Sequence, residues 1–273
     1  MRAPPAHVNM PSMGSESLIL AVVSSPQDAV EVMNKAAALG RRVDARVDVL
    51  DLHAPACFQG DQADAILRRV ESSCPVLVLR TPAGSAGLRR FTAHDSDWEF
   101  ATRCPAPVLL VRGRTWQDPP KFGVPVDVAD EEEEPLVPGI LRAANRLAIG
   151  TEAQVDVLYS ERETNDEAVR MRRAVRLAQL VRQTHVGGAR IEMFAGEPVK
   201  RLPPLVAARR YDVLVLGGAP RREGIVQRMP VKLARLLEAT DGDALLVGRP
   251  GGATQPSPDS ALQQRPHQAE QLA

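Results

Sequence analysis

Aromatic side chains are scarce in this sequence: phenylalanine, tryptophan and tyrosine make up 3% of its 273 residues. Proteins that bind single-stranded nucleic acid commonly stack the bases on aromatic rings, so this scarcity counts against that class of function. The sequence also has no excess charge of either sign, with 34 basic and 34 acidic residues. No overall positive field therefore draws the chain toward nucleic acid or anionic lipid.

Cysteine is equally rare, and the three residues Cys57, Cys74 and Cys104 lie far apart. None forms a CxxC pair, and an odd number does not suit a disulfide framework, so we expect structural thiols in a reducing compartment. No apolar run approaches the roughly 20 residues that cross a bilayer, and the N-terminus lacks the apolar core of a secretion signal. The sequence therefore predicts a cytoplasmic protein without a transmembrane segment.

Both ends of the chain lack an apolar period. Residues 1–16 and 251–273 are rich in proline, glycine, glutamine and serine. We expect two disordered tails, because such segments bury too little apolar surface to offset the entropy lost on ordering.

Between the tails, short apolar runs alternate with longer amphipathic stretches, which is the pattern of strands and helices in a parallel α/β sheet. Right-handed crossovers would join these elements into an open, doubly wound, Rossmann-like sheet. The second half predicts strands at 121–128, 154–160, 189–195, 211–217 and 243–248, and helices at about 136–150, 165–185, 199–209 and 228–239.

The first half repeats the end of this scheme. The tetrapeptide VLVL begins at 76 and again at 213, and VLLV at 108 matches ALLV at 244, so the two spacings are 137 and 136. The first strands, near 18–23 and 122–128, are only about 103–105 residues apart. The first half therefore lacks about 30–35 residues, the size of one strand plus one helix. We predict two α/β domains in tandem, at 17–116 and 117–250, the first shorter by about one βα unit.

Two segments of the sequence carry a resemblance to a known family. The stretch "DWEFATRCPAPVLLVRGRTW" at 97–116, followed by "VDVADEEE" at 126–133, resembles the middle of tandem universal stress proteins of the UspE type. The segment 211–250 resembles the closing strand, glycine loop, helix and strand of the same family, the UspA superfamily. The resemblance implies adenine nucleotide alpha hydrolase-like domains, a stress-response role in the cytoplasm and a tandem that imitates a dimer.

The glycine loop "VLVLGGAPRREG" at 213–224 raises the question of a phosphate site. Nucleotide-binding members of the family carry G-x-x-G, about nine further residues and G-[ST], together with an Asp that ends the first strand. Gly217 matches the first glycine and Asp127 matches that Asp. Pro220 stands where the second glycine is expected and has no N–H to donate. Pro230-Val231, or Val231-Lys232, replaces the terminal G-[ST].

We therefore predict a degenerate nucleotide-type pocket in the second half, in which Asp127 orients a polar group and the glycines admit backbone contact. Arg221 would hold an anion. The candidate ligand contacts are Asp127, Gly217, Gly218, Arg221 and Gly224. In the first half, "RTPAGSAG" at 80–87 also offers glycines, but the following helix is rebuilt around Trp98, and we expect no nucleotide there.

Three functions stay open at this point: a non-catalytic ligand-binding or regulatory module, an ATP-binding protein with weak nucleotide hydrolysis, and a scaffold whose halves pair with each other or with partners. We expect no cofactor, with ATP as the alternative ligand, and further self-association stays open. No histidines at i, i+4 spacing and no G-x-S-x-G motif occur, so we predict neither a metal site nor a catalytic residue. The arginine-rich stretch 169–182 predicts a surface helix, with an acidic partner or lipid headgroups as the alternative.

Overall fold

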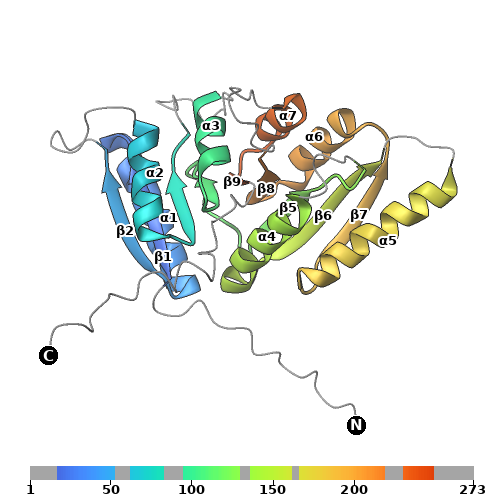
Figure 1. Cartoon of the computed structure of the whole chain (residues 1–273), viewed down its shortest axis with the longest axis horizontal. Coiled ribbons are helices and arrows are strands. Elements are labelled where there is room, and N and C mark those ends of the chain that lie inside the picture. The colour runs from blue at the N-terminus through green and yellow to red at the C-terminus, as the bar shows by residue number, and fades with distance from the viewer. Residues whose placement is uncertain are drawn as a thin grey trace, which may run out of the picture.

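The computed structural model describes residues 17–52, 62–82, 95–129, 136–161, 166–218 and 230–248, and both predicted tails lie outside these ranges. In this part the chain forms one open α/β sheet with helices against both faces (Figure 1). The first half contains β1 (Leu18–Val23), α1 (Pro26–Val43), β2 (Arg46–Asp51), α2 (Gln62–Ser73), β3 (Leu77–Arg80), α3 (Asp95–Arg103) and β4 (Val108–Leu110). The second contains β5 (Lys121–Pro125), α4 (Val137–Thr151), β6 (Gln154–Glu161), α5 (Glu167–Gln183), β7 (Arg190–Ala195), α6 (Pro198–Arg209), β8 (Val213–Gly217), α7 (Val231–Ala239) and β9 (Asp243–Val247).

The central strands are apolar on both faces. Every residue of β1 (LILAVV) and of β9 (DALLV) is buried. A strand that is covered by helices on both sides needs apolar side chains in both directions, so its sequence does not alternate with polar residues. Helices α1, α4 and α5 pack on one face of the sheet, and α2, α3, α6 and α7 pack on the other.

The strand order is β2-β1-β3-β4-β9-β8-β5-β6-β7. Strands are parallel within each half and antiparallel where β4 meets β9, with Leu109 opposite Leu245. One sheet therefore continues through both halves, which face each other as two subunits of a symmetric dimer would. The predicted fold, Rossmann-like parallel strands in two tandem halves, is confirmed, and the sheets of the two halves join through β4 and β9.

The two halves differ at the outer edge of the sheet. In the second half β7 flanks β6, whereas in the described part of the first half no strand lies beyond β2. The described ranges thus hold four strands in the first half and five in the second, with the outermost strand and its helix missing from the first. This is the βα unit whose loss the sequence spacing predicts.

The duplication extends to single contacts where the halves meet. The Arg112 side chain donates to the carbonyls of Leu237 and Thr240 at the end of α7. Residue 248, 136 positions after Arg112, is a glycine, and a Cβ there would lie 2.9 Å from the Ala101 carbonyl oxygen and 3.2 Å from that of Cys104. Ala101 and Cys104 also precede Leu237 and Thr240 by 136 positions. Each half therefore contacts the C-terminal end of a helix in the other half. The Arg112 side chain contacts the end of α7, and the backbone at Gly248 contacts the end of α3.

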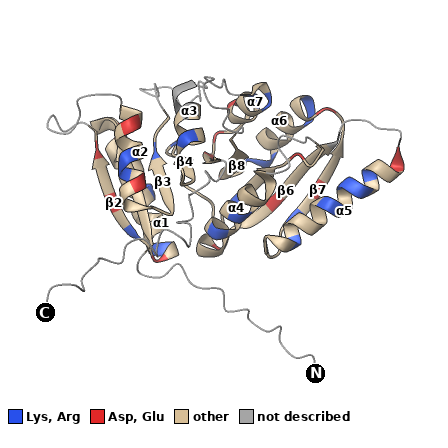
Figure 2. Ribbon diagram, in the orientation of Figure 1, with Lys and Arg blue, Asp and Glu red and all other residues tan. Residues whose placement is uncertain are grey.

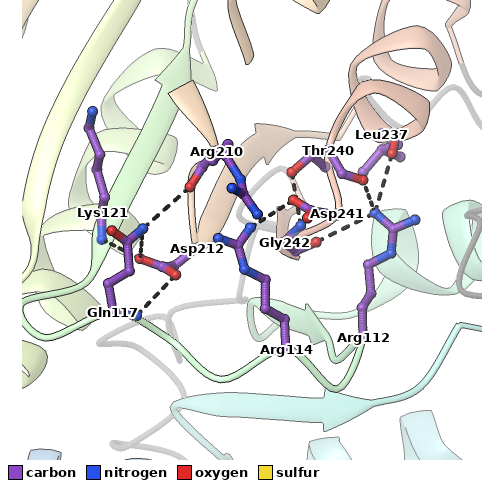
Figure 3. A network of polar contacts seen from close by, with 10 residues as sticks. All are labelled: Arg112, Arg114, Gln117, Lys121, Arg210, Asp212, Leu237, Thr240, Asp241 and Gly242. Carbon is purple, nitrogen blue, oxygen red and sulfur yellow. Dashed lines mark hydrogen bonds and ion pairs between the residues drawn. The ribbon is translucent and has the colours of Figure 1, made fainter. Parts of the chain in front are cut away.

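The segment between the halves is held by two aspartates just before β8 and β9, the buried Asp212 and the exposed Asp241 (Figure 3). Asp212 accepts hydrogen bonds from the backbone N–H groups of Gln117 (3.1 Å) and Lys121 (2.9 Å). Arg114 forms an ion pair with Asp241 at 2.7 Å. Because buried carboxylates need several donors, these contacts fix the path of the chain from β4 to β5.

Helix α5 is held by its C-terminal half. Leu177, Leu180 and Val181 are buried, whereas none of residues 167–176 is. Arginines run along the helix (Figure 2), and Met171 and Val175 are exposed between them. The prediction of an arginine-rich surface helix is thus correct, and the apolar residues Val169 and Ala174 in its N-terminal half are only partly covered. No helix in the described ranges is long and apolar enough to cross a membrane.

Candidate functional site

Three of the residues predicted to bind a ligand, Asp127, Gly217 and Gly218, lie at the carboxyl ends of β5 and β8. These strands are neighbours, and the chain leaves β5 to one side through β6 and returns on the other side as β8. Open α/β sheets bind ligands outside the strand ends at such a point of reversal. Asp127 follows β5 by two residues, Gly217 ends β8 and Gly218 comes next.

The Asp127 carboxylate already has two partners. Its Oδ1 accepts a hydrogen bond from the Ala129 N–H at 3.0 Å, and its Oδ2 lies 3.4 Å from the Lys232 Nζ. The side chains of Asp127 and Lys232 are 14% and 15% exposed. The ion pair is therefore largely shielded from water. A charge-assisted contact is stronger in such a partly buried place than on the surface.

Lys232 comes from the first turn of α7. The positive end of the helix dipole disfavours a cation there, so the nearby carboxylate offsets that repulsion. The sequence shows that Pro230-Val231, or Val231-Lys232, replaces the expected G-[ST] pair, but it does not show where the ammonium group of Lys232 lies. The available signal was a lysine near the position of the expected hydroxyl, 105 residues after Asp127 in the chain.

Packing accounts for both glycines at the end of β8. A Cβ on Gly217 would lie 2.5 Å from Cδ1 of Ile140 in α4, so an alanine would force the Ile140 side chain to move. The Gly218 N–H donates to the Val247 carbonyl at 2.7 Å. A Cβ on Gly218 would lie 3.3 Å from Cγ2 of Thr102, which belongs to the first half. Both glycines therefore serve close approach between elements.

The remaining predicted contacts, Arg221 and Gly224, lie outside the described residues, as does Pro220. The structure thus brings Asp127, Gly217 and Gly218 together at one edge of the sheet and adds Lys232, which sequence reasoning did not place there. In the described ranges, no group of three or more His, Cys, Asp or Glu residues is arranged to hold a metal ion.

Sequence comparison gives one relevant relative. A universal stress protein E homologue from Haemophilus influenzae is 31% identical over 84 residues, which cover 31% of this chain and 27% of that protein. The matched segment therefore spans about a quarter of the relative's length. No protein-family model matches the chain.

Solved structures cover much more of the chain. A Pseudomonas aeruginosa UCBPP-PA14 protein assigned to the universal stress proteins matches 86% of this chain and 95% of its own, with a TM-score of 0.63 at 16% identity. A universal stress protein from Archaeoglobus fulgidus matches 86% of this chain and 97% of its own, with a TM-score of 0.53 at 11% identity. The chain has the tandem universal stress protein fold. The resemblance stated from the sequence is thereby confirmed.

Within this universal stress protein fold, phosphate groups of a ligand would be bound by backbone N–H groups and a helix N-terminus at this edge. The Gly218 N–H donates to Val247, and the Asp127 carboxylate contacts Lys232 and Ala129. These described polar groups thus make contacts within the protein.

The same edge of the first half carries different residues. Ser24 stands 103 positions before Asp127, the spacing at which β1 and β5 correspond, so the carboxylate is missing there. The strand registers place Thr81 and Pro82, 136 positions earlier in the chain, where the second half has Gly217 and Gly218. Side chains thus occupy the first-half positions at which the second half has glycines.

Proposed function

We propose that this chain is a universal stress protein that serves the cytoplasmic stress response as a non-catalytic regulatory module. In this proposal its nucleotide-type pocket is degenerate, and the Lys232 side chain closes it. The observation that carries the proposal is the ion pair between Lys232 Nζ and Asp127 Oδ2, 3.4 Å apart and largely buried.

The ion pair acts against nucleotide binding in two ways. It removes the carboxylate that, by family resemblance, would contact the adenosine. It also puts an ammonium group where a small residue and a hydroxyl would hold the distal phosphates. A nucleotide would have to separate two partly buried opposite charges, and separating such a pair costs several kcal/mol unless the ligand satisfies both groups. A small molecule that carries an acidic group for Lys232 and a donor for Asp127 would satisfy both partners of this pair.

Thermal melting with and without Mg-ATP tests the proposal. A ligand at 100 times its Kd stabilises the native state by about 2.7 kcal/mol, which gives an easily measured rise in Tm. We expect no rise for the wild type at millimolar Mg-ATP. Lys232→Ser, which frees Asp127 and restores a hydroxyl, is expected to gain affinity for ATP.

Lys200→Ser is the matched control, because Lys200 also lies in the first turn of a helix and pairs with an acid, Glu197, but is 78% exposed. This control should behave as the wild type does. A rise in the wild-type Tm with Mg-ATP that Asp127→Ala abolishes would instead establish the alternative, an ATP-binding protein with weak hydrolysis.

A further inference from the structure

The segment from α1 to β2 has a close counterpart in the second half. The tetrapeptide VDVL occurs at 47–50 and at 155–158, a spacing of 108 residues. At the same spacing, α1 and α4 end in equivalent hydrogen bonds, from Ala45 N–H to the Gly40 carbonyl and from Ala153 N–H to the Ala148 carbonyl. Residues that are 108 apart in α1–β2 and α4–β6 therefore occupy equivalent places.

In the second half, helix α5 covers this surface. Leu141 and Asn145 of α4 and Val155 and Val157 of β6 are each at most 6% exposed. Leu177, Leu180 and Val181 of α5 belong to the same hydrophobic core. The Asn145 side chain also donates to the carbonyl of Thr184, the residue that ends α5, at 3.4 Å.

In the first half, the equivalent residues are Met33 and Ala37 of α1 and Val47 and Val49 of β2. Met33, Ala37 and Val47 are half-buried and Val49 is 43% exposed. This surface is therefore apolar, but no helix of the described residues covers it as α5 covers its counterpart. Only residues 52–61 separate β2 from α2, and about a dozen residues or more are needed for one crossover. This stretch is therefore too short to supply a counterpart of α5 and β7. We call these four residues the α1–β2 surface.

The open edge of β2 is protected against pairing with a further strand. Arg46 and Leu52 donate their N–H groups to β1, so by alternation the Val49 N–H points away from the sheet. That N–H donates to the Asp48 Oδ1 at 3.0 Å, and the Arg69 side chain from α2 binds Oδ2 of the same carboxylate. Arg69 also holds the pKa of Asp48 below its usual value, which keeps the carboxylate charged. An inward charged residue of this kind blocks strand addition.

The equivalent acid in the second half makes a different contact. Asp156 is buried and accepts a hydrogen bond from the Tyr211 hydroxyl at 3.0 Å, and β6 pairs with β7 along its edge, with Val157 opposite Ile191. The first half has thus lost the strand and capped the edge, but it has kept the apolar face on which a helix packs.

We propose that the α1–β2 surface is the docking site for an amphipathic helix of a partner protein, which packs there as α5 packs on α4 and β6. Such a helix presents apolar residues at i, i+3 and i+4, as α5 does with Leu177, Leu180 and Val181. Arg41, in the last turn of α1, favours an orientation that puts the negative C-terminal end of the incoming helix beside it. The helices in the described part of this chain already bury their own apolar faces, so a second copy has no spare helix to offer.

The α5 sequence is itself the probe. A fluorescent peptide of residues 166–186 is added to the full chain, and its anisotropy is followed as the chain concentration rises. We expect saturable binding, and we expect a peptide with serine at 177, 180 and 181 not to bind. Val49→Asp and, independently, Ala37→Arg should weaken binding at least about tenfold. Val231→Asp, a change at an exposed valine on α7, should leave binding unchanged.

Circular dichroism and Tm establish that each variant is folded before its binding is compared. Absence of saturable binding at about 1 mM chain would overturn the proposal. So would binding that persists in both Val49→Asp and Ala37→Arg, because the peptide would then be exchanging with α5 in the second half. A chain that sediments as a dimer and becomes a monomer on Val49→Asp would show that a second copy is the occupant, which also overturns it.

Discussion

Lys35 and Asp243 join the two halves of the molecule by a buried ion pair. The Nζ of Lys35, in α1, lies 3.0 Å from Oδ2 of Asp243, at the start of β9, and the two side chains are 12% and 0% exposed. Asp243 also accepts hydrogen bonds from the Arg112 backbone N–H and the Trp116 Nε1, each at 2.8 Å. The Lys35 ammonium in turn lies 4.4 Å from the centre of the Trp116 ring. One carboxylate thereby ties α1, the connecting segment and β9 together.

Replacement of Lys35 tests how much this contact contributes. Lys35→Ala leaves a fully buried carboxylate with neutral donors only, and removing one member of a buried pair destabilises by about 3–5 kcal/mol. Urea unfolding measures the change. Lys200→Ala removes an exposed lysine from an exposed pair and should leave the free energy of unfolding almost unchanged. Equal, small changes in the free energy of unfolding of the two variants would contradict the claim that the Lys35–Asp243 pair holds the halves together.

The pH dependence of stability should reveal the burial of Cys104. Burial raises the pKa of this thiol from 9.0 to about 11. The folded state therefore keeps the neutral thiol, while the thiol of the unfolded chain ionises above pH 9. The contribution of Cys104 to the free energy of unfolding is therefore fully present below pH 9 and is lost as the pH rises toward 11. The loss from this group is at most about 2–3 kcal/mol. Urea unfolding of the wild type and of Cys104→Ala at pH 8 and pH 10.5 isolates it, because every other titrating group is shared. Parallel pH profiles would exclude the effect.

Gly217→Ala should destabilise the fold through Ile140. The added Cβ would lie 2.5 Å from the Ile140 Cδ1, and such overpacking costs about 1–3 kcal/mol. Ile140→Val removes that Cδ1, so the double variant should recover part of the loss, and a double-mutant cycle measures the coupling. If the effects of the two changes on the free energy of unfolding are additive, the contact with Ile140 does not explain the glycine at 217. Ligand binding would then be the better explanation.

Asp48→Ala should promote edge-to-edge association. The change frees the Val49 N–H on the open edge of β2, which then can pair with a strand of another molecule. Sedimentation velocity should show a larger mass than for the wild type. Asp64→Ala is the control, because Asp64 forms a similar exposed pair with Arg103 but lies on helix α2. An unchanged mass for Asp48→Ala would mean that other features of β2 protect the edge.

The sequence predicts most of the fold because apolar runs and spacing are local signals. The runs that form β1, β3 and β4 and every strand of the second half were identified. The spacing of 136 residues aligns β4 with β9 correctly, but the VLVL match at 137 is wrong by one residue, because the strand registers align β3 with β8 at 136. The exception is β2, where RVDVLD carries three charged residues and does not read as a buried strand. Its match to VDVL at 155–158 was the available signal.

The site was predictable only in part. Asp127 and the two glycines follow from their positions after strands, but their contacts depend on residues far away in the sequence. Lys232 reaches Asp127 across 105 residues, and Thr102 of the first half approaches Gly218. Asp212 and Asp243 resemble ordinary turn residues until the connecting segment is seen to donate its N–H groups to them. Such pairings arise from tertiary structure, which local patterns do not encode.

A crystal soaked in millimolar Mg-ATP gives the most direct view of the closed pocket. We predict that Lys232 stays on Asp127 and that no triphosphate density appears between residues 217 and 232. Density for a triphosphate there, with the Lys232 ammonium moved away from Asp127, would contradict the proposal and make the chain a nucleotide-binding universal stress protein.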